Sequence, residues 1–463
     1  MKSKVPEYID LPHKVRMTEF PLEKVCPILA EIENFFRKWS PESYDGYYFG
    51  CALSLVSIIS ARRVQYYRDG PCPTNFYIVL VGETGLSAKT TVMNLVKVVL
   101  RNLELEYLLI PDTITAQKLF SEMCLKIPED FQKGENSVKR DVEKQMQDTQ
   151  AFVGQKGWIY DEMGDLYREM MQNGHHNSSF RGLLKRLEDN PTSLGIGTQK
   201  RGKEISYYPF LTLLGAMTPA DLSPFAKKGT ALWHDGSLGR IVFISAPDDF
   251  RKDCPFPNEE RIVPLVILEG LSEWNIRLGR PQIKLVPEVQ VIEAPGELFK
   301  LSDEVKKASY QYRSALKDMI ERWKAQGESN DLAGNYIRLP DLALRIATIV
   351  ASVNGEREIT LKHWAFAQNK TEQWRKELHW LYSNALANSN MLQSFPYQDP
   401  KEKVLELIIV KGPLTSREIQ QFSHFKKASV ESLLAVLVKE GEITKIESGK
   451  TFKYIEKTGE IDV

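Results

Sequence analysis

Residues 78–91 read IVLVGETGLSAKTT, and this stretch decides the fold that we predict. The apolar run 78–81 predicts a buried strand, a glycine-rich turn follows, and the run VMNLVKVVLRNL predicts a helix. This order is typical of a phosphate-binding loop, because backbone N–H groups at the helix start can face phosphate oxygens. We predict that a nucleotide binds here at Gly82, Glu83, Thr84, Gly85, Leu86, Ser87, Ala88, Lys89, Thr90 and Thr91.

In such a loop, Lys89 would reach the β- and γ-phosphates, and the Thr90 hydroxyl would hold Mg²⁺. The spacing departs from the usual G-x-x-x-x-G-K-[ST] pattern. Gly82 lies one residue further from the lysine, and Ala88 stands at the last glycine position. The alternative interpretation is a glycine turn before a helix that happens to carry a lysine.

Composition bounds the class of protein. The chain has 463 residues, of which 42% are hydrophobic and 26% are charged, and its formal net charge is zero. This length allows two or three soluble domains. No apolar run reaches membrane-spanning length, the N-terminus does not read as a signal peptide, and the five cysteines form no C-x-x-C pair. We expect a cytoplasmic protein without a membrane contact, a zinc site or a disulfide framework.

The predicted elements divide the chain into five parts. Residues 1–74 are expected to form an arm and a helical segment, and residues 75–255 an α/β core. A helical lid is predicted over 256–390, a linker over 391–399 and a compact unit over 400–463.

Within the core, strands and helices alternate, which predicts a mainly parallel sheet with helices on both faces. Besides the first strand, the predicted strands are 105–110, 157–162, 210–216 and 239–246. The segment 192–208 alternates around a basic tip and predicts a β-hairpin. The charged segment 128–150 predicts an exposed insertion.

The C-terminal half is predicted to be mostly helical. Helical periodicity recurs at 257–278, 301–325, 336–353 and 360–386. Residues 400–456 predict three helices and a two-stranded hairpin, which is the order of a winged helix-turn-helix. Thr415 and Glu418 have the spacing of a capping box at the second of these helices.

Acidic and polar side chains follow two of the core strands. Asp161 and Glu162 close the strand 157–162, where the aspartate would bind Mg²⁺ and the glutamate would orient the attacking water. The alternative is that both residues cap the next helix. Thr218 ends the neighbouring strand and could touch the γ-phosphate, although a simple turn before Pro219 explains it equally well.

Three arginines are candidates for phosphate contacts. Arg240 stands just before a strand, where it could reach a neighbouring subunit's nucleotide, or form a surface salt bridge. Arg338 and Arg345 stand seven residues apart on one helix face. The alternative for Arg345, within an apolar run, is a buried ion pair.

Basic residues suggest where nucleic acid would bind. Lys200, Arg201 and Lys203 crowd the tip of the predicted hairpin and could follow a nucleic-acid backbone. Lys426 and Lys427 precede the third helix of the C-terminal unit, and Lys450 lies on its hairpin. A charged, solvated turn is the plainer alternative at the hairpin tip, and a contact with protein rather than DNA is the alternative for the C-terminal unit. The pair His175-His176 lies in a polar loop and suggests no metal site.

Taken in order, these residues resemble an MCM-like AAA+ helicase, and more narrowly the MCM-like replicative helicases of phages, plasmids and chromosomal cassette elements. The resemblance covers roughly residues 75–456. MCM proteins carry an alanine before the loop lysine, as at Ala88. Their acidic motif D-E-F-D-K-M corresponds to DEMGDL at 161–166, and their sensor motif A-A-A-N-P to GAMTP at 215–219.

Three further features of that family find counterparts here. The finger motif L-S-R-F corresponds to LGRI at 238–241, and the R-x6-R helix to Arg338 and Arg345. The family's hairpin points a lysine into the central pore, which suggests Lys200 or a neighbour. The family too ends in a winged helix. We expect no counterpart of the N-terminal barrel and zinc module of cellular MCM proteins before residue 75.

The resemblance implies an α/β fold: an AAA+ P-loop NTPase core with a helical N-terminal segment, a helical lid and a C-terminal winged helix. It implies an ATP- and Mg²⁺-dependent helicase that works as a ring, with a hexamer expected, in the replication of a mobile element. Lys89, Thr90, Asp161 and Glu162 would come from one subunit, and Arg240 and Arg338 from the next. A single DNA strand would fill the pore, duplex DNA is a further candidate for the winged helix, and other replication proteins of the same element are candidate partners.

Two rival functions remain open. The same ATPase could load or remodel a replication or transposition nucleoprotein complex without unwinding DNA. Alternatively, the chain could be a DNA-binding initiator or adaptor whose irregular loop no longer hydrolyses ATP. The set of Lys89, the Asp161-Glu162 pair and Arg240 argues against the second rival, and a strand-displacement assay separates the first.

Overall fold

The computed structural model describes residues 5–126, 136–171, 176–198, 202–225, 233, 236–247, 249–286, 289–293, 296–392, 400–423, 427–448 and 451–456. The chain divides into two compact units, residues 1–386 and residues 387–463. The predicted boundaries at 74 and 255 both fall inside the first unit and remain predictions.

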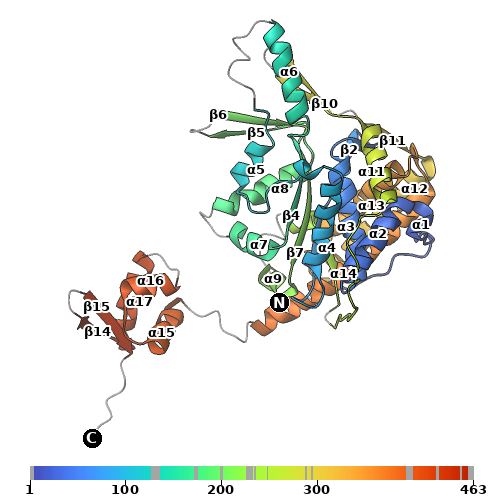
Figure 1. Ribbon diagram of the computed structural model, residues 1–463. Helices are drawn as coiled ribbons and strands as arrows, with labels where there is room; N and C mark the ends of the chain where they lie inside the picture. Colours follow the sequence, from blue (N-terminus) through green and yellow to red (C-terminus); the bar gives the residue numbers. More distant parts are fainter. Residues whose placement is uncertain are drawn as a thin grey trace. The chain divides into compact units, whose positions relative to one another are not determined.

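A four-stranded parallel sheet lies at the centre of the first unit (Figure 1). Across the sheet the order is β4 (Gln155–Tyr160), β7 (Phe210–Met217), β3 (Tyr77–Val81) and β8 (Val242–Ser245). Every residue of β3 and β7 is buried, as expected for strands that are covered on both faces. The predicted parallel sheet is therefore present, and the strand that precedes Thr218 lies next to the strand that precedes Asp161.

The strand predicted over 105–110 is wrong. Residues Glu106–Leu108 form a 3₁₀ turn, η1, and only Leu109 makes a single parallel bridge to Gly157 of β4. Glu104 at φ 58° bends the chain before this turn, and Pro111 follows without an N–H to donate. The chain therefore touches the sheet edge at one point instead of extending it.

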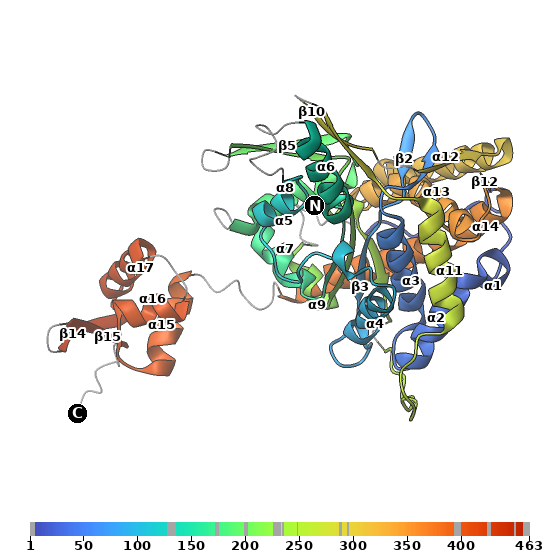
Figure 2. The same cartoon turned by 45° about the horizontal axis from the view of Figure 1, so that its top comes forward.

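Helices cover both faces of the sheet (Figures 1 and 2). One face carries α3 (Asp45–Ser60) and α4 (Lys89–Asn102), and the other carries α7 (Met163–Met171) and α8 (Phe180–Glu188). Helix α3 is buried from Tyr47 to its end, and Ser57 Oγ lies 2.6 Å from Thr212 Oγ1 of β7. The predicted N-terminal helical segment thus supplies a layer of the core itself, with α2 (Pro27–Trp39) packed outside it.

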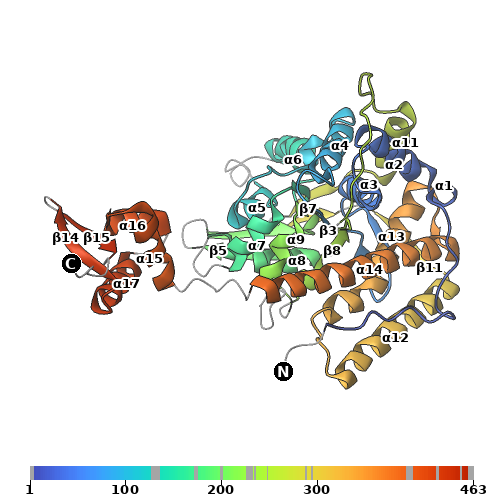
Figure 3. The ribbon, with the colours of Figure 1, turned by 90° about the horizontal axis from the view of Figure 1, so that it is seen from below.

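Four further helices of the first unit overlap the ranges that were predicted to be helical after residue 255, and their role as a lid remains a prediction. They are α11 (Leu265–Leu278), α12 (Asp303–Gln326), α13 (Ala333–Val353) and α14 (Leu361–Leu392). The predicted N-terminal arm is bound to them (Figure 3): Arg375 Nη1 donates to Ile9 O at 3.0 Å, and Met17 N donates to Gln368 Oε1 at 2.8 Å. The arm is therefore bound along α14 rather than standing free.

Several strands of the first unit were not predicted from the sequence. β1 (Val64–Tyr67), β2 (Pro71–Pro73), β11 (Glu297–Leu301) and β12 (Glu358–Ile359) form a second sheet in the order β12-β11-β1-β2. β9 (Gln282–Val286) and β10 (Val289–Glu293) form an antiparallel hairpin. Residues 64–67 were expected to be helical. In the sequence, prolines at 281, 287 and 295 stand on either side of β9 and β10, and such closely spaced prolines argue against strands.

The prediction of a wholly exposed insertion over 128–150 is wrong for its second half. Helix α6 (Asn136–Gln150) buries Met146 against Ile283 of β9. Ile283 N donates to Gln147 Oε1 at 2.7 Å. The predicted hairpin at 192–208 is confirmed as β5 (Ser193–Thr198) and β6 (Gly202–Tyr207).

The second unit has the elements predicted for 400–456. They are α15 (Pro400–Lys411), α16 (Ser416–Ser423), α17 (Lys427–Lys439), β14 (Ile443–Ser448) and β15 (Thr451–Glu456), with a short strand β13 (Leu414–Thr415) beside β15. The capping box is confirmed: Thr415 N donates to Glu418 Oε2 at 2.8 Å, and Glu418 N donates to Thr415 Oγ1 at 3.3 Å. Across the described residues of both units, no helix combines the length and the apolar character that a membrane crossing needs.

Candidate functional site

The glycine-rich loop, residues 82–88, follows β3 at the carboxyl edge of the sheet. Gly82 leaves no room for a side chain, because a Cβ there would lie 2.4 Å from Ser87 Oγ and 2.5 Å from the Tyr47 hydroxyl. The Tyr47 hydroxyl donates to Val81 O at 2.6 Å, and Ser87 Oγ donates to Glu83 O at 3.2 Å. These contacts hold the loop in a compact turn before α4.

Ala88 is the N-cap of α4 and adopts a left-handed conformation, with φ 45° and ψ 39°. This is the backbone geometry for which glycine is usual, and the alanine Cβ costs about 1–2 kcal/mol there. Ser43 Oγ donates to Ala88 O at 3.0 Å, so the segment between α2 and α3 braces the turn. As the N-cap, Ala88 has no polar side-chain group to cap α4, so the N–H groups of the first turn can face an anion.

Lys89 bends back over the loop. Its Nζ donates to the carbonyl oxygens of Gly82 at 2.5 Å and Glu83 at 3.3 Å, and it lies 3.4 Å from Ser87 Oγ. Burial lowers the pKa of Lys89, whereas the charges of Glu83 and Asp221 act in the opposite direction. A phosphate in the turn would offer this ammonium stronger acceptors than neutral carbonyl oxygens.

Asp161 and Glu162 lie between β4 and α7, because β4 ends at Tyr160 rather than at residue 162 as predicted. The register pairs Tyr160 with Gly215, and Met217 with Val81, so β4, β7 and β3 end at one edge. Both acidic side chains are exposed there. Partial burial, followed by the charges of Asp161 and Asp165, raises the pKa of Glu162.

Thr218 is tied to a neighbouring carboxylate. Its N–H and its hydroxyl donate to Asp221 Oδ2 at 2.9 and 2.8 Å, while Arg168 Nη1 of α7 donates to Asp221 Oδ1 at 2.6 Å. Gly164 permits this approach, because a Cβ there would lie 2.3 Å from Asp221 Cγ. Thr218 is therefore held in a local turn at the start of the short helix α9 (Pro219–Leu222), and any contact of its hydroxyl with a nucleotide remains a prediction.

The carboxyl edge offers oxygen ligands of the kind that Mg²⁺ takes. The Thr90 hydroxyl is exposed on the first turn of α4, and the Asp161 carboxylate is exposed beyond β4. Within the described parts of the chain, no three His, Cys, Asp or Glu side chains gather as a ligand set. The Thr90 hydroxyl and the Asp161 carboxylate fit a Mg²⁺–nucleotide complex, since Mg²⁺ is held by one or two carboxylates together with substrate phosphates.

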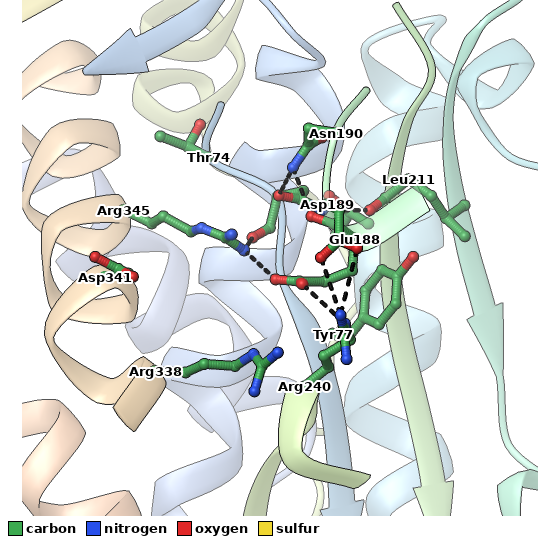
Figure 4. Close-up of polar contacts among 12 residues, drawn as sticks. Thr74, Tyr77, Glu188, Asp189, Asn190, Leu211, Arg240, Arg338, Asp341 and Arg345 are labelled. Atoms are coloured by element: carbon green, nitrogen blue, oxygen red, sulfur yellow. Dashed lines mark hydrogen bonds and ion pairs between the residues drawn. The ribbon is translucent and has the colours of Figure 1, made fainter. Parts of the chain in front are cut away.

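The predicted arginines lie at the opposite, amino edge of the sheet (Figure 4). Arg240 ends the 3₁₀ turn η5 (Leu238–Arg240), directly before β8. Asn335 Nδ2 donates to Leu238 O at 3.0 Å and to Ile241 O at 3.2 Å, so α13 holds this turn in place.

Arg240 is engaged on three sides in this chain. Its Nε lies 3.4 Å from Glu188 Oε2, its Nη2 lies 3.1 Å from Asp189 Oδ1, and its Nη1 donates to Gly236 O at 3.1 Å. Arg345 Nη1 pairs with the other oxygen of Glu188 at 2.9 Å and donates to Asn75 O at 3.0 Å. The ion-pair interpretation is therefore correct for both arginines in the single chain.

Arg338 differs from its neighbours. It shares a face of α13 with Arg345, and its Nη1 donates only to Gly334 O, at 3.1 Å. Among the described residues, no carboxylate lies within ion-pair distance of it. Burial and the charge of Arg240 lower the pKa of Arg338. All three arginines line a cavity of about 310 Å³.

The two edges are too far apart for one chain to bring these groups together. Val242 of β8 pairs with Ile78 of β3, Arg240 stands two residues before Val242, and Gly82 stands four residues after Ile78. Six residues along parallel strands span about 20 Å. The arginines therefore cannot reach a nucleotide in the loop of their own chain without a large rearrangement.

Most of the predicted DNA-binding residues lie outside the described residues: Lys200, Arg201, Lys426 and Lys450. Lys203 lies on β6, directly after the hairpin tip. Lys427 begins α17 and is exposed, with its Nζ 3.8 Å from Glu431 Oε1. Their role toward DNA remains a prediction.

Several residues that shape the site were not predicted. Glu377 of α14 accepts a hydrogen bond from the Tyr44 hydroxyl at 3.1 Å and one from Ser245 N at 3.2 Å, and burial raises its pKa to about 7. Ser43 and Tyr47 contact the loop from the segment at α3. No local pattern identifies these long-range contacts. Asp221 could have been found, because Thr218 and Asp221 have the spacing of a capping box.

Comparison with known proteins gives little direct guidance. No protein-family model and no curated protein matches this chain. Among solved structures, the chain is similar to a full-length MCM homolog from Methanopyrus kandleri, at 12% identity and a TM-score of 0.40. The match covers 81% of this chain, and this chain spans 63% of that one. A likeness at this level assigns no function.

Proposed function

We propose that this protein is an ATP-driven DNA helicase that works as a ring of identical subunits, in the replication of a mobile element. The observation that carries the proposal is the division of the site. A loop suited to phosphates lies at the carboxyl edge of the sheet, and the arginines lie about 20 Å away at the amino edge. Hydrolysis that uses both sets needs two copies of the chain, and a closed ring supplies that contact at every subunit.

Residues of the carboxyl edge would bind and activate the nucleotide. The N–H groups of residues 82–91 and the Lys89 ammonium would hold the phosphates. Thr90 and Asp161 would hold Mg²⁺, which neutralises developing charge on the phosphates when bound. Glu162 would orient water and accept its proton, a role suited to a carboxylate whose pKa is raised.

Thr218 would complete this edge. Its hydroxyl is oriented by Asp221, and Arg168 fixes that carboxylate in turn. A hydroxyl oriented in this way could contact the γ-phosphate or the attacking water. We therefore propose Thr218 as a polar sensor of the nucleotide state.

The second copy would supply positive charge. Arg240 and Arg338 would face the phosphates of the neighbour's nucleotide and stabilise the charge that develops in the transition state. Because the cavity lies at the amino edge, a neighbour could present its loop there without unfolding either chain.

The proposed DNA contacts come from two other parts of the chain. The β5–β6 hairpin would carry Lys200, Arg201 and Lys203 to a single strand in the ring's centre, through salt-sensitive phosphate contacts. The unit at 400–463 would act as a winged helix that meets duplex DNA through Lys426, Lys427 and Lys450. In this proposal 75–255 is the ATPase core, 256–390 its lid and 391–399 a linker.

Mixing two inactive variants tests the shared site. A chain with Lys89→Ala keeps its arginines, and a chain with Arg338→Ala keeps its loop. Each alone should lose ATP turnover. A one-to-one mixture should recover about a quarter of wild-type turnover, because about one interface in four then joins an intact loop to an intact arginine.

A mixture of Lys89→Ala with a chain that carries both substitutions is the matched control and should stay inactive, since it contains no intact loop. No recovery in the first mixture would refute the shared site. A forked duplex then separates unwinding from the loader alternative: DNA-stimulated ATP turnover without strand displacement would favour the loader.

A further inference from the structure

Glu188 joins two of the three arginines at the amino edge (Figure 4). It is the last residue of α8, and it is 7% exposed. Its Oε1 lies 2.9 Å from Arg345 Nη1, and its Oε2 lies 3.4 Å from Arg240 Nε. A carboxylate buried to this extent is tolerated only with cationic partners, and here two guanidinium groups share it.

The backbone around Glu188 is fixed by its own contacts. Asn190 adopts φ 50°, and its Nδ2 donates to Glu188 O at 2.8 Å and to Asn75 Oδ1 at 2.6 Å. Asn75 O in turn accepts from Arg345. The end of α8, the start of β3 and α13 are therefore locked together, and Glu188 is positioned by elements on every side.

This arrangement divides the arginines into two kinds. Arg240 donates hydrogen bonds through Nη1 and Nη2, while its Nε lies within ion-pair distance of Glu188 without a hydrogen bond. Arg345 is held by Glu188 and a backbone carbonyl. Arg338 has one contact with a backbone carbonyl and, among the described residues, no carboxylate. An anion that enters the cavity would find open donors on Arg338 first.

The cavity also suits an anion by its charge. Five arginines line it, against the three carboxylates Glu188, Asp189 and Asp341. Asp341 is already paired with Arg68 and with Arg313. Tyr66, Phe76 and Trp374 add an apolar part to the wall, which limits the water that screens the charges.

We propose that Glu188 is a positioning residue that holds Arg240 and Arg345 in place, so that Arg338 is the arginine that meets an incoming phosphate. The incoming group is a phosphate of a nucleotide bound to a second copy, and in this respect the inference rests on the proposed function. Arg240 becomes available to that phosphate only when it leaves Glu188 and Asp189.

Removing the charge of Glu188 should change the affinity of the cavity for phosphate. Glu188→Gln keeps the size of the side chain and removes its charge. It should release Arg240 toward the cavity and add one net positive charge, so that phosphate binds more tightly. A residue with a purely structural role would give the opposite result, because its loss would only disturb the cavity.

The test measures binding of inorganic pyrophosphate to the full chain by calorimetry. All variants carry Lys89→Ala, so that the loop does not bind the probe. Relative to this parent, Arg338→Gln should weaken binding at least tenfold, and Glu188→Gln should strengthen it about tenfold. Arg101→Gln, which removes an exposed arginine paired with Glu106 at the far end of α4, is the matched control and should bind like the parent.

Asp189→Asn keeps the test decisive if Glu188→Gln does not fold. Asp189 is exposed and pairs with Arg240, so its loss should strengthen binding a few-fold without disturbing the core. Unchanged binding by Arg338→Gln, or no gain from either carboxylate variant, would overturn the proposal. The test needs neither a ring nor hydrolysis, so its failure is distinct from a failure of the mixing experiment.

Discussion

The two edges of the sheet are built in opposite ways. At the carboxyl edge, the loop, Lys89 and Thr90 come from nine consecutive residues, and the turn is largely backbone geometry. At the amino edge, Arg240, Arg338 and Glu188 come from three separate elements and are joined by ion pairs and side-chain hydrogen bonds. The phosphate loop of the first edge is preformed by local sequence, whereas the second edge depends on the packing of α8, η5 and α13.

The largest effect should come from the lysine of the local edge. Lys89→Ala removes the ammonium that lies over the loop carbonyls, and turnover of ATP should fall at least about a thousandfold, or about 4 kcal/mol of transition-state stabilisation. Lys97→Ala is the matched control on the same helix, because Lys97 pairs at the surface with Asp112 at 2.8 Å. Steady-state phosphate release measures the turnover of both variants. Similar rates for the two would show that the loop is not part of the proposed site.

This contrast explains what the sequence could predict. Strands β3, β7 and β8 and the loop follow from contiguous apolar runs and a glycine-rich turn, so local pattern was sufficient. The same pattern failed at 105–110, where apolar residues suggested a strand but Glu104 and Pro111 allow only one bridge. The pairing of Arg240 and Arg345 through Glu188 joins residues up to 157 apart, and no local signal carries such a contact.

A methyl group at Gly82 should have the next largest effect. Gly82→Ala would place a Cβ 2.4 Å from Ser87 Oγ and 2.5 Å from the Tyr47 hydroxyl, so the turn must shift. We expect ATP affinity to fall about 10- to 100-fold. Gly327→Ala, at the end of α12 and far from the loop in sequence, is the control: its Cβ meets nothing within 4 Å, and its positive φ of 70° costs stability of about 1 kcal/mol.

Fluorescent ATP-analogue binding measures both glycine variants. Equal losses of affinity would show that the close approach at Gly82 does not shape the site. This result tests whether backbone geometry alone shapes the phosphate loop at the carboxyl edge.

The carboxyl edge also depends on a distant helix, because Glu377 of α14 accepts a hydrogen bond from Ser245 N at the end of β8. Burial raises the pKa of Glu377 to about 7, whereas an unfolded chain releases this proton near pH 4.3. Between these values the folded state binds more protons, so the free energy of unfolding falls as pH rises. The groups around the carboxyl are Tyr44, Ser245, Gln373 and the charge of Lys370.

Glu377→Gln removes this titration. Relative to wild type, the variant should gain on the order of 1–3 kcal/mol of stability between pH 5 and pH 8. Urea unfolding of both proteins across that range measures the difference, with Glu31→Gln on an exposed position of α2 as the matched control. A difference in stability that stays constant with pH would show that Glu377 does not titrate between pH 5 and pH 8. The carboxyl edge would then lack this dependence on α14.

The smallest effect concerns one backbone angle. Ala88 holds φ 45° without glycine, so Ala88→Gly should relieve the Cβ contact and raise the free energy of unfolding by about 0.5–1 kcal/mol. Ala308→Gly, inside α12 where the backbone is helical, should lower it by about 1 kcal/mol. Denaturant unfolding gives both values. Because the N–H groups of α4 keep their direction in either case, ATP turnover by Ala88→Gly should stay near wild type. A loss of turnover would mean that the methyl group of Ala88, and not only the left-handed turn, shapes the loop. The phosphate loop would then also depend on the packing of its side chains.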